Sequence, residues 1–221
     1  MRVVFMGTPD FAVGTLKAII EVGHDVAAVV TQPDKPRGRS KSLVFSPVKE
    51  EAVAHGITVL QPERARDEAF VEELRTYNAD VIVVVAFGQL LPASIINMPR
   101  YGCINVHASL LPKYRGASPI QWAVIDGCEY SGVTTMKMDE GLDTGDILMV
   151  EKVKLDAKET GGSLFDRLSD VGAHLLVKTL EGLEAGTITP VKQDDSESTY
   201  VKMLHKSFGK MDFNKSAAEL E

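Results

Sequence analysis

Two polar residues that could take part in acid–base chemistry lie two positions apart at the end of an apolar segment. Asn105 and His107 follow Cys103 and Ile104, in a run that is typical of a short strand. Because side chains alternate along a strand, both residues should lie on the same side of a sheet. A histidine can exchange protons near neutral pH, and an asparagine amide can donate to a developing oxyanion. Taken alone, however, the pair is explained more simply by a capping Asn and a hydrogen-bonded structural His.

A carboxylate that could act with this histidine occurs further along the chain, in a glycine-rich loop. Asp143 lies between Gly141 and Gly145, so this loop can approach another backbone closely. There the carboxylate could orient His107 and favour its charged form. An Asx-type turn between two strands is the common alternative, and Asp143 by itself therefore carries little weight.

A third candidate is a basic loop between a predicted strand and a predicted helix. Cations recur at every second position, at Lys35, Arg37, Arg39 and Lys41. Such a loop on an acidic protein could contact the phosphate backbone of a nucleic acid. A solvated loop without a ligand is the simpler interpretation of the charges alone. We expect the loop to be mobile without RNA, because its cations repel one another and it has few apolar anchors.

Several common catalytic signatures are missing from the sequence. The turn Gly7-Thr8-Pro9 is not GxGxxG, and no GxxxxGK[ST] segment occurs. No HExxH motif and no Cys/His cluster has metal-ligand spacing, so we predict no metal. Ser109 lacks a G-x-S-x-G elbow and lies two residues from His107, which argues against a Ser-His-Asp hydrolase.

The first half of the chain alternates between predicted strands and predicted helices. This alternation implies right-handed crossovers and an α/β fold with a Rossmann-like, doubly wound and mostly parallel sheet. Open sheets of this kind bind ligands at the carboxyl ends of their strands, where Asn105 and His107 lie. The predicted strands are 2–6, 25–31, 57–60, 81–86 and 103–106, and the predicted helices begin near 11, 47 and 67.

The second half of the chain is less regular. Strands are predicted at 133–138 and 147–155, and a helix at 162–183 has apolar residues at spacings near 3.6. The pattern fades after Thr187, and residues 193–198 are polar. We therefore predict a catalytic domain over residues 1–190, followed over residues 191–221 by a linker and the start of a further domain that the chain does not contain.

The composition is that of an ordinary soluble globular protein. Of its 221 residues, 44% are hydrophobic and 25% are charged, and a net charge of −7 argues against binding nucleic acid through the whole surface. Two cysteines without a CxxC motif favour a reducing compartment. The N-terminal segment lacks the features of a signal peptide, and the longest apolar run, 81–87, is too short to span a membrane. We expect a cytoplasmic protein.

Considered together, these segments resemble the family of formyltransferases that use 10-formyltetrahydrofolate. The resemblance extends from the first residue to the last. The basic loop, which begins Gln32-Pro33-Asp34-Lys35-Pro36, is similar to that of the branch that acts on initiator tRNA. The other segments that carry the resemblance are Met6–Phe11, Phe87–Pro92, Asn105–Gly116, Pro119-Ile120-Gln121 and Leu142–Asp146.

The resemblance implies a formyltransferase fold and a reaction. The formyl group would pass from 10-formyltetrahydrofolate to the α-amino group of methionyl initiator tRNA. Asn105 and a protonated His107 would stabilise the oxyanion, and Asp143 would keep His107 charged and assist proton movement. The implied tRNA contacts are Lys35, Arg37, Arg39 and Lys41. The implied folate contacts are Phe87, Gly88, Gln89, Leu90, Leu91, Pro92, Ser109, Leu110, Leu111 and Pro112.

One other transferase function stays open. A folate-dependent formyltransferase that acts on a sugar or nucleotide amine shares these motifs, and only the basic loop argues against it. A non-enzymatic binding protein is disfavoured by the complete catalytic set. Members of the family usually continue into a C-terminal β-barrel that helps to hold tRNA. We therefore expect this chain, as a monomer, to fold and to bind the folate but to use tRNA poorly.

Overall fold

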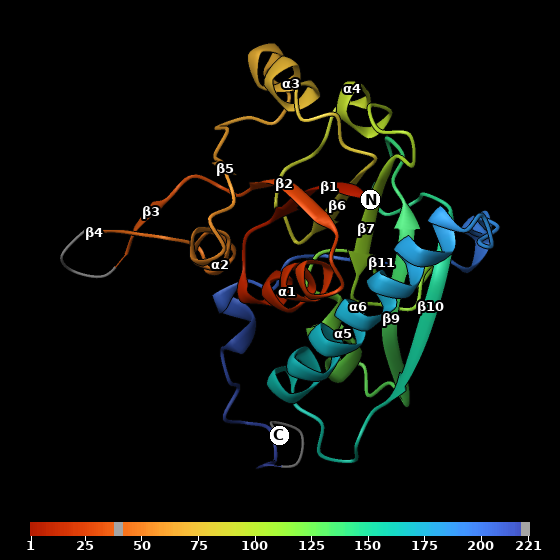
Figure 1. Cartoon of the computed structure of the whole chain (residues 1–221). Coiled ribbons are helices and arrows are strands. Elements are labelled where there is room, and N and C mark those ends of the chain that lie inside the picture. Colours follow the sequence, from red (N-terminus) through yellow and green to blue (C-terminus); the bar gives the residue numbers. More distant parts are fainter. Residues whose placement is uncertain (38–41, 218–221) are drawn as a thin grey trace.

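The computed structural model describes residues 1–37 and 42–217, and these residues form a central seven-stranded sheet (Figure 1). Its strand order is β10-β9-β7-β6-β1-β2-β5. The strands from β7 to β5 pair in parallel, whereas β9 is antiparallel to both β7 and β10. The predicted α/β fold with a mostly parallel, Rossmann-like sheet is confirmed. The strands are β1 (Arg2–Gly7), β2 (Asp25–Val30), β5 (Val59–Leu60), β6 (Val81–Val85), β7 (Cys103–His107), β9 (Tyr130–Lys137) and β10 (Ile147–Lys154).

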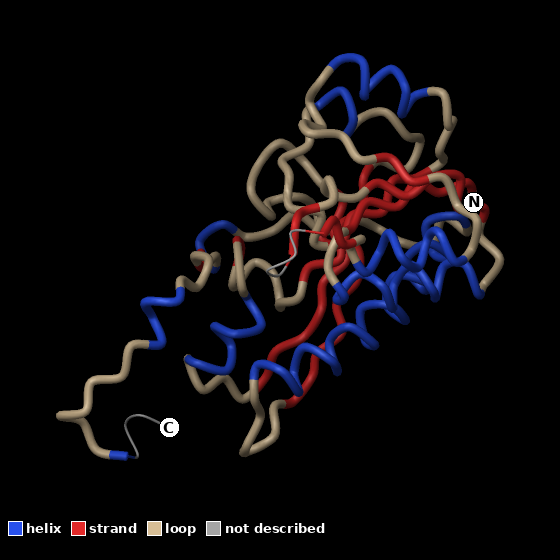
Figure 2. The backbone as a smooth tube through the Cα atoms, turned by 90° about the vertical axis from the view of Figure 1, so that its left-hand side faces the viewer, coloured by secondary structure: helices blue, strands red, loops and turns tan. Residues whose placement is uncertain are grey.

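Helices cover both faces of the sheet, and the turned view of Figure 2 shows the sheet between them. Because side chains alternate along a strand, β1 contributes to two hydrophobic cores. Val3 and Phe5 belong to the core under α1 and α6, and Val4 and Met6 belong to the core under α3 and α4. The helices of the first face are α1 (Val13–Glu21), α2 (Pro47–Ala54), α5 (Pro119–Ile125) and α6 (Gly161–Glu184), and those of the second are α3 (Glu68–Arg75) and α4 (Ala93–Ile96).

The longest predicted elements are confirmed, and burial explains them. Strand β6 is buried along its whole length because helices cover both of its faces. The helix predicted at 162–183 is α6, one residue longer at each end. Its start is fixed by a capping box, in which Thr160 accepts a hydrogen bond from the Ser163 backbone and Ser163 accepts one from the Thr160 backbone.

Short strands appear where the sequence predicted only loop. In the basic segment, β3 (Lys35–Arg37) pairs antiparallel with β4 (Ser42–Val44), and we call these two strands the basic hairpin. Near the predicted catalytic residues, β8 (Arg115–Gly116) pairs in parallel with β11 (Tyr200–Val201). Pairs of two or three residues show no apolar alternation, since backbone hydrogen bonds alone define them. The mobility expected for the basic loop stays a prediction.

The chain beyond α6 first packs on the body of the molecule and then leaves it. The 3₁₀ helix η2 (Asp195–Glu197) and β11 lie against the loop that follows β7, and Gln193 contacts the loop that follows β9. Later residues extend away from the sheet (Figure 2). The extended part contacts α5 through Trp122, whose indole N–H donates to the Lys202 carbonyl at 2.7 Å. The boundary at residue 190 stays a prediction. No helix in the described part of the chain is long and apolar enough to cross a membrane.

Candidate active site

Strand β7 places Asn105 and His107 on one side of the sheet, as the alternation predicted. Cys103, in the same row, belongs to the core under α3 and α4, whereas Ile104 and Val106 belong to the opposite core. Asn105 is half-buried between β6 and β9, where its backbone is registered with Val84 and Met136. His107 ends the strand and is only 7% exposed. On this side of β7, the apolar residue Cys103 is therefore followed by two polar residues toward the carboxyl end of the strand.

The contacts of His107 determine which nitrogen carries its proton. Nε2 lies 3.0 Å from the carbonyl oxygen of Tyr114, which can only accept a hydrogen bond. Nε2 therefore donates, and Nδ1 is the atom that faces Asp143, with 3.7 Å between it and Oδ2. At this distance the two groups form an ion pair when the imidazole is protonated, not a direct hydrogen bond.

The Asp143 carboxylate is directed at the β7 loop, and a neighbouring aspartate makes the Asx turn. Asp139 Oδ1 accepts hydrogen bonds from the Gly141 N–H at 3.0 Å and from the Thr144 hydroxyl at 2.6 Å. Asp143 Oδ2 instead accepts from the Gly116 N–H at 2.8 Å. Asp143 has a φ of 55°, a left-handed conformation that aspartate tolerates better than most residues. The simple turn interpretation of Asp143 is therefore wrong, because the turn belongs to Asp139.

Tyr114 is held by its own side chain, which fixes the carbonyl that His107 contacts. Its hydroxyl donates to Asp126 Oδ2 at 2.9 Å and lies 3.0 Å from Cys128 Sγ. Burial, together with these hydrogen bonds, raises the pKa of the Tyr114 hydroxyl further above neutral pH, where the phenol is a hydrogen-bond donor to Asp126. The residue has a φ of 58°, and this conformation turns its carbonyl away from an extended path.

The segment Ser109–Pro112 is an ordered turn in which Ser109 has a structural contact. The Ser109 hydroxyl donates to the Lys113 carbonyl at 2.7 Å, and the residue is buried. Thr134 of β9 joins the two ends of the turn, because its hydroxyl donates to the Ser109 carbonyl at 2.7 Å and accepts from the Leu111 N–H at 3.2 Å. Leu111 is buried, and Leu110 and Pro112 are half-buried. These contacts engage Ser109 with the backbone of its own turn and not with His107.

The segment Phe87–Pro92 follows β6 and is tied to the ends of β1 and β2. The Phe87 carbonyl accepts from the Thr8 hydroxyl at 3.2 Å and from Gln32 Nε2 at 3.1 Å, and Gly88 has a φ of 85°. Gln89 accepts from the Ala65 N–H at 2.7 Å and donates to the Pro62 carbonyl at 3.2 Å, so it supports the neighbouring loop. Phe87 and Leu91 are buried, and Pro92 is half-buried before α4.

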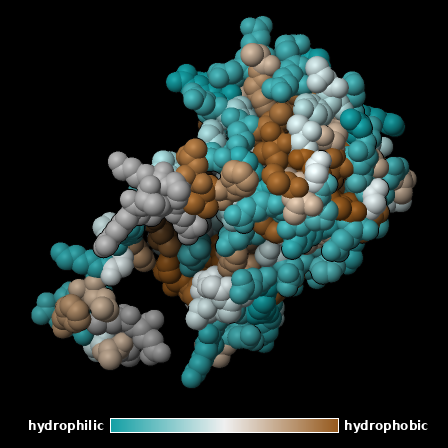
Figure 3. Space-filling view, turned by 60° about the vertical axis from the view of Figure 1, so that its left-hand side comes forward, coloured by the Kyte–Doolittle hydropathy of each residue, from teal (hydrophilic) through white to brown (hydrophobic). Residues whose placement is uncertain are grey.

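Leu90 is the exposed apolar side chain of this segment. It is 84% exposed and lines a shallow hollow of about 310 Å³ together with Arg64, Ala65, Arg66 and Gln89. Figure 3 shows a mostly hydrophilic face on which hydrophobic residues gather toward the middle. Two of the residues that line the hollow, Arg64 and Arg66, are cationic, so the hollow combines an exposed apolar side chain with positively charged residues.

The basic hairpin is fixed at its base by a charged cluster. Lys49 of α2 pairs with Asp34 and donates to Gln61 Oε1 at 2.7 Å, while Gln61 Nε2 donates to Asp34 Oδ1 at 2.9 Å. We call these three residues the hairpin anchor. The hydrogen bond from Lys49 lowers the pKa of the Asp34 carboxyl. Lys35 is exposed beyond the anchor, and Arg37 is paired through its backbone with Ser42. Arg39 and Lys41 lie outside the described residues.

Two residues that the sequence analysis did not single out contact this site. Arg115 and Gln193 are buried and hydrogen-bonded to each other beside the Asp143 loop. Arg115 lies within the Asn105–Gly116 segment, so its place beside the predicted catalytic residues was a usable signal. Gln193 belongs to a polar stretch with no apolar pattern, and its position follows only from the pairing of β8 with β11.

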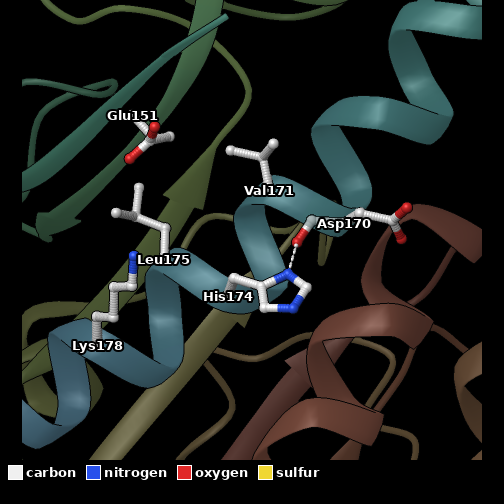
Figure 4. Close-up of a pocket in the computed structure, with 6 residues that line it drawn as sticks. All are labelled: Glu151, Asp170, Val171, His174, Leu175 and Lys178. Atoms are coloured by element: carbon white, nitrogen blue, oxygen red, sulfur yellow. Dashed lines mark hydrogen bonds between the residues drawn. The ribbon is translucent and has the colours of Figure 1, made fainter.

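A second hollow lies between α6 and β10 (Figure 4). Its volume is about 270 Å³, and it combines residues of both charge signs with two apolar side chains. His174 is engaged within its own helix, where Nδ1 lies 2.7 Å from the Asp170 carbonyl. In residues 1–37 and 42–217 no group of three or more His, Cys, Asp or Glu side chains could hold a metal ion. The lining residues are Glu151, Asp170, Val171, His174, Leu175 and Lys178.

Comparisons of sequence with known proteins agree with each other. Residues 1–180 match the family model described as formyl transferase. Methionyl-tRNA formyltransferase of Lachnospira eligens is 99% identical over 221 residues, which cover 100% of this chain and 70% of the relative. The enzyme of the same name from Agathobacter rectalis is 61% identical over 221 residues, covering 100% of this chain and 71% of the relative.

Solved structures resemble the chain in fold at low sequence identity. A 4-N formyltransferase from Francisella tularensis aligns with a TM-score of 0.72 and 20% identity, over 98% of this chain and 82% of that structure. An N-formyltransferase from Helicobacter canadensis, in complex with folinic acid and dTDP-3-aminofucose, has a TM-score of 0.70 and 21% identity. That alignment covers 99% of this chain and 77% of the structure. At such identities the likeness shows the formyltransferase fold alone.

Proposed function

The chain belongs to the formyl transferase family, and we propose that it uses Asn105, His107 and Asp143 to move a formyl group from 10-formyltetrahydrofolate to methionyl initiator tRNA. It is an enzyme of one-carbon transfer whose acceptor is methionyl-tRNA and whose formyl donor is derived from a folate. The observation that carries the residue assignment is the approach of Asp143 Oδ2 to His107 Nδ1, at 3.7 Å, beside Asn105 at the carboxyl end of β7.

The attacking group in this reaction needs little activation. A free α-amino group has a pKa of about 8, and the neighbouring ester lowers it further, so a neutral amine is present near pH 7. When the amine attacks the formyl carbon, negative charge develops on the formyl oxygen. Asn105 Nδ2 donates to that oxygen, and the positive charge of a protonated His107, which is only 7% exposed, stabilises it.

Asp143 supports the charge of His107 and moves a proton. Because Nε2 is bonded to the Tyr114 carbonyl, the second proton of the imidazolium is carried on Nδ1, facing the carboxylate. The carboxylate also accepts the proton that the attacking nitrogen loses. The new C–N bond forms, the bond from the formyl carbon to N10 breaks, and the proton finishes on N10 of the leaving folate. The balance requires no covalent enzyme intermediate.

In this proposal the segments Phe87–Pro92 and Ser109–Pro112, which lie beside the site, supply the folate contacts. Backbone groups of Phe87–Pro92 and the half-buried residues Leu110 and Pro112 can contact a flat ring without burying an unpaired charge. Leu90 adds exposed apolar surface at the rim. The basic hairpin supplies the cations for the tRNA backbone, with Lys35 as the described member that is exposed.

A panel of amine acceptors tests the proposal and separates it from the sugar-amine alternative. The full chain is incubated with 10-formyltetrahydrofolate and either methionyl initiator tRNA or amino sugars, and the formylated product is measured. We expect product with the tRNA and background levels with the amino sugars. Comparable rates on an amino sugar, or no product with the tRNA under conditions where folate binding is detected, would overturn the proposal.

A further inference from the structure

We propose that Gln193 and Arg115 are positioning residues that hold Asp143 and His107 in register, which makes the segment 191–201 part of the active-site scaffold. This inference deepens the proposed function and rests on it for the roles of Asp143 and His107. It is carried by a continuous set of hydrogen bonds between the two catalytic loops and the chain beyond α6.

Gln193 holds the backbone of the Asp143 loop. Its Nε2 donates to the carbonyl of Asp143 at 2.9 Å and to the carbonyl of Gly145 at 2.7 Å, and only 7% of the residue is exposed. Both amide protons are therefore used on a loop whose Asp143 adopts a left-handed φ of 55°. A conformation that is costly in isolation persists where the surroundings over-determine it.

Arg115 fixes the orientation of the Gln193 amide. Its Nε and Nη2 donate to Gln193 Oε1 at 3.1 and 2.8 Å, and Nη2 also donates to Asp195 Oδ1 at 2.8 Å. Since a guanidinium only donates and carbonyls only accept, the amide has a single orientation that satisfies both neighbours. Arg115 is 1% exposed, and a buried cation of this kind needs such partners.

Residues on either side of Arg115 contact the two catalytic side chains. The preceding carbonyl, of Tyr114, accepts from His107 Nε2, and the following N–H, of Gly116, donates to Asp143 Oδ2. Strand β11 holds this stretch through bonds from the Arg115 N–H to the Thr199 carbonyl at 2.8 Å and from the Ala117 N–H to the Val201 carbonyl at 3.0 Å. A shift of Gln193 or Arg115 therefore moves both partners of the His107–Asp143 pair.

Gln193→Glu isolates the positioning contact. The new carboxylate still accepts from Arg115, but it cannot donate to the carbonyls of Asp143 and Gly145. We expect kcat to fall by up to about 100-fold with little change in KM for the folate, because displacements near 1 Å have effects of this size. Gln193→Asn keeps the amide but is too short to span both contacts, and it serves if the first variant does not fold. Glu197→Gln, an exposed change in η2, four residues further along the chain, is the matched control.

A double-mutant cycle with Asp143→Asn distinguishes positioning from general stability. If Gln193 acts through Asp143, Gln193→Glu lowers kcat much less in the Asp143→Asn background than in wild type. Multiplicative losses, or an unchanged kcat in a folded Gln193→Glu chain, would overturn the proposal.

The ring-nitrogen NMR shifts of His107 provide a readout that needs no turnover. We expect them to change in Gln193→Glu and to stay at wild-type values in Glu197→Gln. Unchanged shifts in Gln193→Glu would count against positioning even if formyl transfer itself were not observed. Changed shifts without transfer would retain the positioning role and reject the proposed reaction.

Discussion

At the residue scale, the account depends on what each proposed catalytic side chain can donate or accept. The Tyr114 carbonyl fixes the tautomer of His107. Asp139 accepts the hydrogen bonds that form the turn, so the Asp143 carboxylate is not needed for them. Asn105 differs from His107 and Asp143, because its amide carries no charge and contributes only a correctly oriented hydrogen bond. Each residue therefore has a separable contribution, and substitutions that preserve shape can separate them.

Asn105→Ala should lower kcat by roughly 10²–10³, the usual cost of removing one oxyanion donor. The side chain is half-buried at a strand end, so its loss leaves the sheet intact. Single-turnover formylation rates with saturating folate measure the effect. Asn97→Ala, an exposed change after α4, is the control. Near-normal turnover in Asn105→Ala would remove the assigned role.

The sequence was sufficient to identify Asn105, His107 and Asp143 as candidates, because strand alternation and glycine-flanked loops have local signals. It was not sufficient for Gln193. That residue lies in a polar stretch, and its burial arises only when β11 pairs with β8. The paired residues Tyr200 and Arg115 are 85 positions apart in the chain. A buried glutamine that bridges a guanidinium and two carbonyls depends on tertiary structure and leaves no periodic pattern.

At the element scale, two short structural features hold the loops to which we assign tRNA binding and catalysis. The hairpin anchor fixes the base of β3 and β4, and the β8–β11 pair fixes the loop after β7. Long elements such as β6 and α6 could be predicted because burial imposes periodicity over many residues. The short pairs could not, since their register is set by backbone bonds between distant segments.

Replacement of Asp34 by Asn should change how stability depends on pH. The hydrogen bond from Lys49 lowers the folded-state pKa of Asp34, so its stabilising effect is complete above the ordinary aspartate pKa and is lost as pH falls through the lowered value. We expect the free-energy difference between wild type and Asp34→Asn to shrink on acidification. Urea unfolding between pH 7 and pH values below about 3 measures it. A difference that stays constant across this range would contradict the anchor.

Gly116→Ala should destabilise the chain by about 1–3 kcal/mol. Gly116 has a φ of 101°, and a Cβ there would lie 2.5 Å from the carbonyl oxygen of Val201. The strand pair must therefore open or shift, which also displaces the N–H that contacts Asp143. Urea midpoints report the loss. Gly209→Ala, where a Cβ meets open space, is the control, and equal midpoints for the two variants would show that the β8–β11 contact is loose.

At the scale of the whole molecule, the charge is acidic overall, and the basic hairpin is a local exception to it. The net charge of −7 gives no general attraction for RNA, so the basic hairpin is the feature expected to contact phosphates. The layered fold and the position of the strand ends could be predicted from the alternation of elements. The direction of the hairpin could not be predicted, because it depends on an anchor assembled from the loop after β2, from α2 and from the loop after β5.

Lys35→Ala should raise KM for methionyl-tRNA while leaving KM for the folate unchanged. If Lys35 neutralises one phosphate, the slope of log KM against log salt should decrease by roughly 0.9 in the variant. Steady-state assays over a salt series give both values. Lys158→Ala, an exposed cation beyond β10, should leave the slope unchanged. The same slope for wild type and Lys35→Ala would exclude this phosphate contact.

The most direct test of the central claim compares two aspartates of one loop. Single-turnover formylation of methionyl-tRNA is measured for wild type, Asp143→Asn and Asp139→Asn. Asn can replace the turn-forming oxygen of Asp139, whereas Asn at 143 retains an acceptor for Gly116 but loses the charge that faces His107. The account predicts a loss of about 10²–10⁴ for Asp143→Asn and a near-wild-type rate for Asp139→Asn. A near-wild-type rate for Asp143→Asn would contradict it.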